Sequence, residues 1–215
     1  MRLDHVSYAC TNEEIGDVVQ RLGSALGGTF TDGGRHPRFG TRNFILPLAA
    51  GTYLEVVAAL EHPAADKAPF GQAVRRRCGL GGGWLGWVVA VPDLAPYEQR
   101  LGRAAVPGNR VRPDGVELRW HQIGILDVLD DPQLPFFTHW EVEPALHPSA
   151  TASDAIAIHG LQIAGDPVTL ARWLGEPADH PLEDIDVTWT TGEDGGSTGL
   201  SAVVFQTSHG LVRID

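Results

Sequence analysis

The feature that most constrains the fold of this chain is a strand–helix pattern that occurs three times along it. A residue suited to cap a helix stands at Asn12, Asp93 and Asp166, each time seven residues after a fixed position in a short apolar strand. Apolar residues at helical spacing follow each cap, and further strand-like segments follow each helix. The pattern predicts a repeated strand–helix–strand–strand–strand unit.

The repeat divides the chain into two parts, joined by a Pro-containing linker at residues 144–151. We expect a two-module domain over residues 1–143, with module one at 1–62 and module two at 82–143. A third module of the same type is expected at 152–215. It either covers a sheet edge of the first two modules or pairs with a second copy of the chain, so a homodimer is one arrangement that stays open.

Charge and hydropathy limit the partners and the location. The 215 residues include 27 acidic and 16 basic side chains, a formal net charge of -11, which disfavours contact with nucleic acid or an anionic membrane. The sequence contains no apolar run of the about 18–20 residues that a membrane-spanning helix needs. The acidic Asp4 departs from the pattern of a secretory signal peptide, so we expect a cytoplasmic protein. We expect its ligand to be a small molecule.

Two predicted strands of the first module each carry one side chain that can bind a metal ion. His5 lies in the apolar segment 3–10, and Glu55 lies among Leu and Val residues in the segment 53–57. A His and a Glu on two strands of one sheet can converge on a single point. Two alternatives stay open: His5 as a histidine of the core, and Glu55 as a buried carboxylate neutralised by Arg42.

The order of these segments resembles the vicinal oxygen chelate superfamily, which includes glyoxalase I, extradiol dioxygenases, epimerases and bleomycin-resistance proteins. Within it, the chain is most similar to the glyoxalase-like domain family, through the motifs Leu3-Asp4-His5, Gly34-Arg35-His36-Pro37, Gly40-Thr41-Arg42-Asn43, Tyr53-Leu54-Glu55 and Arg112–Trp120. The resemblance implies an α+β fold in which repeated βαβββ modules form a curved mixed β-sheet with a ligand site in its concavity. Two modules pair, and a third βαβββ-like module follows at the C-terminus.

The resemblance also implies where a metal ion would bind. The positions that match the family's metal ligands are His5, Glu55, Gly86 and His139. Gly86 has no side chain to coordinate with, which departs from a four-ligand glyoxalase I site. The remaining three would hold a divalent ion, either Zn, Mn, Fe or Ni, and leave positions open for substrate or water.

Candidates for proton transfer and substrate binding lie in both modules. A general base is needed if the chain is an enzyme, and Glu141, His36 or His121 could serve. Arg42 could hold a carboxylate of the substrate by a bidentate hydrogen bond. For His36 and Arg42, which lie in a glycine-rich stretch, the alternative is a solvated turn.

Three tryptophans of module two, Trp84, Trp87 and Trp120, either line an aromatic cavity or belong to the core, and their size favours the core. Two functions therefore stay open. The first is a metal-dependent isomerase, lyase or dioxygenase acting on a small oxygen-rich substrate. The second is a binding or resistance protein that sequesters a small molecule without metal or catalysis, which the missing ligand at Gly86 favours.

Overall fold

The computed structural model describes residues 1–153, 155–177, 180–190 and 198–215. Module one has the predicted strand–helix–strand–strand–strand order, with β1 (Arg2–Ala9), α1 (Ile15–Leu26), β2 (Thr31–His36), β3 (Thr41–Leu48) and β4 (Thr52–Ala59). Two helices follow it, α2 (Pro63–Lys67) and α3 (Pro69–Gly79). Module two repeats the order with one added helix, in β5 (Gly83–Ala90), α4 (Ala95–Leu101), β6 (Val106–Val111), β7 (Glu117–Ile123), α5 (Ile125–Asp130) and β8 (Phe136–Trp140).

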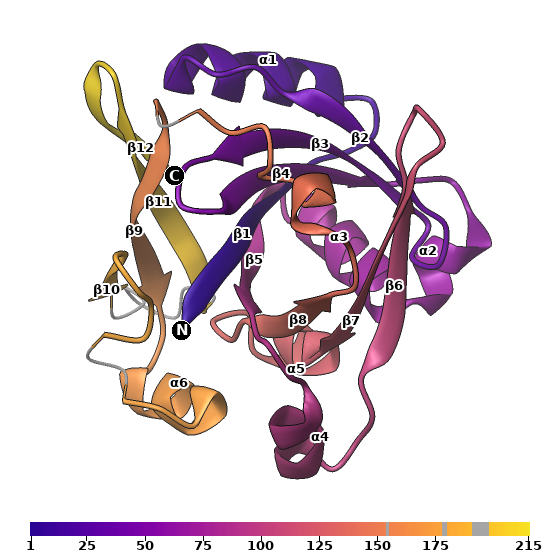
Figure 1. The fold of residues 1–215 in the computed structure, drawn as a ribbon, viewed down its shortest axis with the longest axis vertical. Coiled ribbons are helices and arrows are strands. Elements are labelled where there is room, and N and C mark those ends of the chain that lie inside the picture. The colour runs from indigo at the N-terminus through magenta and orange to yellow at the C-terminus, as the bar shows by residue number, and fades with distance from the viewer. Residues whose placement is uncertain (154, 178–179, 191–197) are drawn as a thin grey trace.

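The strands of modules one and two form a closed, eight-stranded mixed sheet in the order β1-β4-β3-β2-β6-β7-β8-β5. Each module contributes four neighbouring strands, with its first and last strands parallel. The modules join where β1 runs antiparallel to β5 and where β2 meets β6. The predicted α+β fold, in which repeated modules form a curved mixed sheet, is therefore confirmed (Figure 1).

The C-terminal part forms a separate four-stranded sheet beside this barrel. After the short helix η1 (Pro144–Leu146) come β9 (Ala157–Ala164), α6 (Pro167–Leu174), β10 (Asp186–Thr190), β11 (Gly199–Thr207) and β12 (Gly210–Ile214). The order of elements matches that of module one, but β9 pairs in parallel with β10 rather than with the last strand. The domain boundaries drawn from the sequence stay a prediction.

The helix caps follow the sequence in two of the three repeats. Asp166 caps α6 by accepting hydrogen bonds from the backbone N–H groups of Val168 and Thr169. Asp93 accepts one from the N–H of Ala95 at the start of α4. In the first repeat the expected cap at Asn12 is wrong, because the Thr11 hydroxyl and the Glu14 carboxylate bond each other's backbone N–H groups in a capping box one residue earlier.

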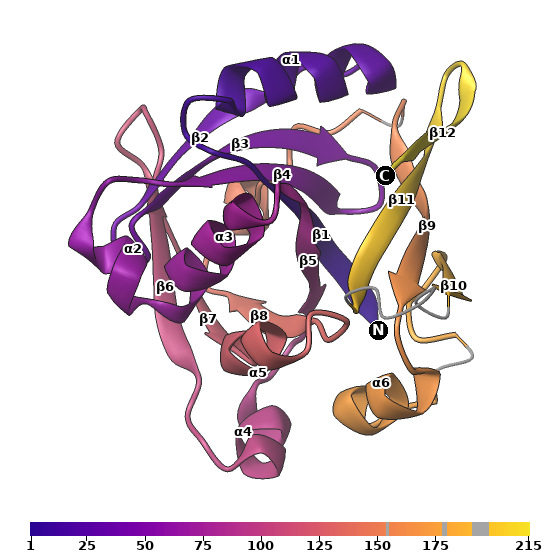
Figure 2. The same ribbon diagram turned by 180° about the vertical axis from the view of Figure 1, so that it is seen from behind.

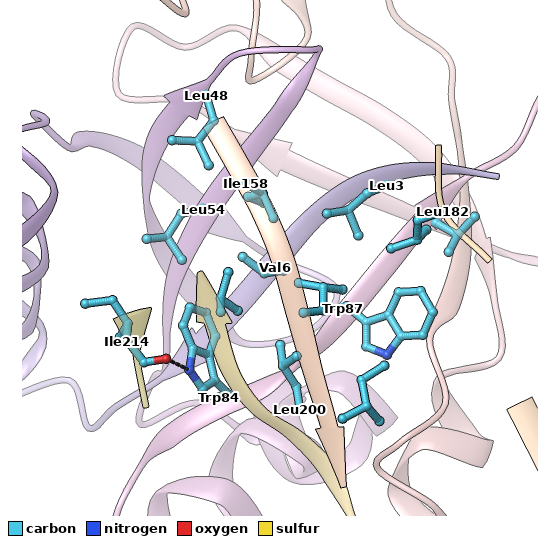
Figure 3. Packing of buried hydrophobic residues seen from close by; sticks show 14 of the residues in the cluster. Leu3, Val6, Leu48, Leu54, Trp84, Trp87, Ile158, Leu182, Leu200 and Ile214 are labelled. Carbon is cyan, nitrogen blue, oxygen red and sulfur yellow. Dashed lines mark hydrogen bonds between the residues drawn. The ribbon is translucent and has the colours of Figure 1, made fainter. Parts of the chain in front are cut away.

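The main apolar core lies outside the barrel, between β1, β4 and β5 and the elements that cover them. Leu3 and Val6 of β1 and Trp84 and Trp87 of β5 face the C-terminal sheet, where β9 contributes Ile158 (Figure 3). Both tryptophans are at most 5% exposed, and their indole N–H groups donate to the carbonyl oxygens of Ile214 and Gln133. The C-terminal sheet is thus held to the barrel by apolar packing and by the hydrogen bond from Trp84 to Ile214 of β12.

The two openings of the barrel are covered by different segments. Helices α3 and α5 lie across one opening, where Phe70, Val74, Ile125 and Val128 join a second buried cluster (Figure 2). The linker that contains η1 lies in front of the other opening (Figure 1). The barrel interior is therefore shielded at both ends, and the candidate site lies within it.

Among the described residues, no helix is both long enough and apolar enough to cross a membrane.

Candidate functional site

Strand alternation on β1 and β4 turns a set of polar side chains into the barrel. Val6 of β1 belongs to the outer core, while His5 lines the internal cavity. Ser7 is aligned with Glu55 of the parallel strand β4, and their side chains meet inside. One face of the same strand thus builds the core and the other builds the site.

The Glu55 carboxylate is the centre of this polar set. It is 4% exposed, and it accepts hydrogen bonds from the Ser7 hydroxyl at 2.6 Å and from the Asn43 amide at 2.7 Å. Burial alone raises the pKa of Glu55, but the charges of His5 and His36 and these two hydrogen bonds outweigh it and lower the pKa below its ordinary value. The carboxylate is therefore ionised at neutral pH.

His5 is held in one orientation by its neighbour Asp4. A bulge in the pairing of β1 with β5 between Leu3 and His5 interrupts the alternation of side chains there. His5 Nδ1 lies 2.7 Å from Asp4 Oδ2, the ring stacks on Tyr53 at 4.4 Å, and Nε2 lies 3.9 Å from Glu55 Oε2. The contact with Asp4 therefore turns the second ring nitrogen toward Glu55.

Asp4 is completely buried, and it is satisfied by groups from module two and from the linker. The indole N–H of Trp140 donates to Asp4 Oδ1 at 3.0 Å, and His147 Nε2 lies 3.2 Å from the same oxygen. Burial raises the pKa of Asp4, but the hydrogen bonds from His147 and His5 and the charges of both rings reverse the effect and hold the pKa well below its usual range. The ionised Asp4 thus orients His5 and also binds His147 of the linker.

His36 lies at the end of β2 and is a buried residue of the cavity wall, so the alternative of a solvated turn is wrong for this residue. Its Nδ1 lies 2.8 Å from the Thr41 hydroxyl, and its Nε2 lies 3.4 Å from the Asn43 amide nitrogen. Burial lowers the pKa of His36 to about 4, and Arg110 and His5 act in the same direction, while Glu55 opposes them. The imidazole is therefore neutral near pH 7.

Two further polar groups line the cavity without a partner among the described residues. Gln122 accepts the indole N–H of Trp120 at 2.8 Å, but its own amide nitrogen is buried without an acceptor. Arg110 is 4% exposed, and its Nε is buried without an acceptor among the described residues. Buried donors without acceptors are costly, so both are available to a ligand.

The cavity itself is small and has aromatic walls. Its open volume is about 30 Å³, room for one or two water molecules or for a reacting group of a few atoms. Besides the polar groups, it is lined by Phe39, Phe70, Trp120, Phe136 and Trp140. Four site residues that the sequence singled out, His5, Glu55, His36 and Trp120, are brought together here.

Three other predicted residues face away from the cavity, because β7 and β8 present alternate residues to opposite sides. On β8, Thr138 and Trp140 line the cavity, whereas His139 between them lies 3.1 Å from the carbonyl oxygen of Val91. The half-exposed side chains of His121 and Glu141 contact each other, with 2.9 Å between Nδ1 and Oε1. The structure therefore does not bring His139 to His5 and Glu55, and it keeps His121 and Glu141 away from the cavity.

Arg42, Trp84 and Trp87 do not line the internal cavity either. Arg42 pairs with Asp32 at 3.1 Å and lies over the Phe44 ring, while the next residue, Asn43, points inward. The two tryptophans belong to the outer core, which confirms the interpretation that their size favoured. The arginine that does line the cavity is Arg110, which the register of β6 turns toward it.

The arrangement of donors does not fit the three-ligand metal site expected from the sequence. No group of three or more His, Cys, Asp or Glu side chains in the described parts of the chain is placed to hold a metal ion. His5 Nε2 and Glu55 Oε2 remain as a pair of donors, fewer than the three protein ligands of a typical catalytic zinc site. A Cβ atom on Gly86 would meet no described atom within 4 Å, so the missing ligand position is open space.

Comparisons with solved structures show likeness in the fold. A hypothetical protein from Staphylococcus aureus is 14% identical with a TM-score of 0.69, and the match covers 100% of this chain and 98% of that one. A methylmalonyl-CoA epimerase from Mycobacterium tuberculosis is 18% identical over 67% of this chain and 90% of its own, with a TM-score of 0.45. One from Streptomyces coelicolor, in complex with 2-nitronate-propionyl-CoA, is 16% identical over 65% and 96%, also with a TM-score of 0.45.

The search of curated proteins gives no match. A family model described as glyoxalase-like domain matches residues 3–178, which include the whole barrel and the start of the C-terminal part. This match covers most of the chain, which therefore belongs to the glyoxalase-like domain family.

Proposed function

We propose that this protein is an enzyme that moves a proton on a small organic molecule whose reacting group enters the internal cavity of the barrel. The observation that carries the proposal is the buried group of Asp4, His5 and Glu55, in which an ionised carboxylate faces an oriented imidazole across 3.9 Å. That spacing exceeds a direct hydrogen bond, and it lets one reacting atom that lies beside the pair contact both groups. The substrate is a carbonyl compound with a proton on the adjacent carbon.

Glu55 acts as the general base. Its lowered pKa means that it is ionised at neutral pH, which is the form that accepts a proton, and its place in the cavity brings it to the reacting carbon. The proton passes from the substrate carbon to a Glu55 oxygen, and the electron pair of the broken C–H bond forms the C=C bond of an enolate. Return of the proton to the other face or to a neighbouring carbon gives an isomerised product and restores the carboxylate.

The negative charge that develops on the carbonyl oxygen needs a donor, and Gln122 supplies one. Its amide nitrogen is buried without an acceptor among the described residues, and its oxygen is fixed by Trp120. A donor that is held in place before the reaction stabilises a developing oxyanion without reorganisation. His5, held by Asp4, is the second group that faces the reacting atoms.

None of these steps is routed through a metal ion. His5 and Glu55 would be the protein ligands of a divalent ion, and such an ion would polarise the carbonyl oxygen. The third expected ligand, His139, faces the Val91 carbonyl, so the donor set falls short of the one predicted.

A second candidate function is binding without catalysis. The observation that favours it is the aromatic lining by Phe39, Phe70, Phe136, Trp120 and Trp140, which suits the retention of an apolar group. In this case a ligand stabilises the protein but undergoes no exchange of protons. The same experiment separates the two candidates.

The test is incorporation of solvent deuterium, followed by NMR in D2O, into a panel of 2-oxo acids, 2-hydroxy ketones and acyl thioesters. We expect the protein to accelerate exchange at the carbon next to the carbonyl of at least one compound. Glu55→Gln should lower that rate at least 100-fold, the usual size of a general-base contribution. Glu141→Gln is the matched control and should leave it unchanged, because this glutamate lies outside the cavity. Equal rates in the two variants would contradict the assignment of Glu55.

A further inference from the structure

Arg110 stands at the junction of two cavities. It lines the small internal cavity together with His5 and Glu55, and it also lines a larger cavity of about 310 Å³ under the linker. We call this larger cavity the outer chamber; it is lined by Gly33, Ile45, Pro47, Arg112, Leu146, His147 and neighbouring residues of β2, β3, β6 and the linker. Arg110 is therefore the residue that a ligand passing from one cavity to the other would meet.

Arg110 is buried, and one donor of its guanidinium has no hydrogen-bond acceptor among the described residues. The residue is 4% exposed, and its Nε is a buried donor without an acceptor. Most other arginines of the barrel have one: Arg42 pairs with Asp32, Arg112 with Asp114 and Arg119 with Glu117. Burial lowers the pKa of Arg110, and the charges of Glu55 and Asp32 offset this only in part. A buried donor without an acceptor costs free energy, so its retention points to an anion that is bound from outside.

The surrounding backbone makes room for this guanidinium. A Cβ atom on Gly33 would lie 2.8 Å from Arg110 Nη1 and 2.2 Å from Asn43 Oδ1, so a side chain at residue 33 would displace both groups. Asn43 in turn holds Glu55. A glycine at this point of β2 therefore lets the arginine and the base occupy the same small space.

We propose that Arg110 binds the carboxylate of a small organic acid, with the acid's apolar body in the outer chamber and its reacting carbon in the internal cavity. A carboxylate matches the fork of the guanidinium and can accept two parallel hydrogen bonds from it. The negative charges of Glu55 and Asp32 near Arg110 disfavour a dianion such as a phosphate monoester. Ile45, Pro47 and Leu146 give the outer chamber an apolar wall.

The position of the acid's reacting carbon rests on the proposed function. The binding of its carboxylate by Arg110 does not. Binding is therefore measured without turnover, by isothermal titration calorimetry and thermal shift. The probes are lactate, mandelate and phenylpyruvate, each with its matched primary amide, and inorganic phosphate. We expect at least one acid to bind, its amide to bind at least about tenfold more weakly, and phosphate to bind more weakly than the acid.

Three variants test the role of Arg110. Arg110→Met should weaken the binding acid by about 10- to 100-fold, the range for hydrogen bonds to a charged group, and Arg110→Lys should restore only part of the loss. Arg119→Gln is the matched control, because this arginine is exposed and pairs with Glu117 on its own strand, and it should bind the acid like the unaltered protein.

The Tm of the ligand-free protein shows whether the Arg110 variants are folded. If the Arg110 charge is unpaired, Arg110→Met should raise Tm of the ligand-free protein by at least about 2 °C, since a buried charge is replaced by an apolar side chain of similar length. The proposal is wrong if no acid binds, if acid and amide bind equally, or if Arg110→Met lowers Tm while leaving affinity unchanged. Acid binding that depends on Arg110, without deuterium exchange, would remove the proposed proton transfer and leave this inference standing.

Discussion

The inner and the outer face of β1 are built from alternate residues of one strand, and they differ in every physical respect. Outside, Val6 packs in the apolar core with the tryptophans of β5, whose indole N–H groups all have acceptors. Inside, His5 and Ser7 surround an ionised carboxylate, and nearby donors lack acceptors among the described residues. Packing on the outer face stabilises the folded protein, whereas burial of charged groups on the inner face lowers the free energy of unfolding.

The largest effect on stability is expected from the outer face. Trp87 is 1% exposed and donates to the Gln133 carbonyl, so Trp87→Ala leaves a large cavity and an unpaired acceptor. We expect the free energy of unfolding to fall by about 3–5 kcal/mol, measured by urea denaturation. Trp87→Phe keeps most of the volume and should cost less. A loss below about 1 kcal/mol for Trp87→Ala would show that the seam with the C-terminal sheet is not a packed core.

A smaller effect, and one that depends on pH, is expected from His36 on the inner face. Its pKa is lowered to about 4 from 6.5, so between these values the unfolded chain binds a proton that the folded protein does not. The contribution is fully present above about pH 6.5 and decreases by up to about 3 kcal/mol as the pH falls through that window.

Urea denaturation at pH 7, 5.5 and 4.5 measures this contribution. His36→Gln should flatten the dependence of unfolding free energy on pH in this range, even if the variant is less stable overall. The ordinary pKa of a carboxylate lies near 4, so the depressed pKa values of Asp4 and Glu55 act mainly below this window. An unchanged slope in the variant would mean that His36 is accessible to protons in the folded protein.

The smallest effect is expected from His139, which lies near the cavity but faces away from it. If the protein binds Zn2+ or Ni2+, titration calorimetry should give an affinity that His139→Ala leaves within about twofold. His5→Ala and Glu55→Ala should each lower it at least tenfold, because these two residues are the donors that face each other. Loss of binding in His139→Ala would restore the three-ligand set expected from the sequence.

The sequence predicted the order of elements well, because that order depends on local patterns. Apolar runs, capping residues and glycines mark strands and helices without reference to the rest of the molecule, and the one misplaced cap, Asn12, was one residue away from Thr11. The resemblance to a family added the assembly of modules into a curved sheet. The pairing of β9 with β10 in the C-terminal sheet has no such local signal.

The site was harder to predict, because a shift of one residue reverses the face of a strand. His139 and Arg42 are each adjacent to residues that do line the cavity, Thr138 and Asn43. Arg110 was visible only as one basic residue among several. Its burial follows from the closure of the barrel between β2 and β6, which brings distant segments together and leaves no mark in the local sequence.

The most direct test of the difference between the two faces compares neighbouring residues of β1. His5→Gln and Val6→Ala are assayed together for unfolding free energy and for the rate of solvent deuterium exchange into the same substrate, under conditions in which both variants are folded. We predict that His5→Gln lowers the rate at least about 100-fold. Val6→Ala should lower stability by about 1–3 kcal/mol with a rate within about twofold of the unaltered protein. Exchange that survives in His5→Gln but is lost in Val6→Ala would contradict the location of the reaction inside the barrel.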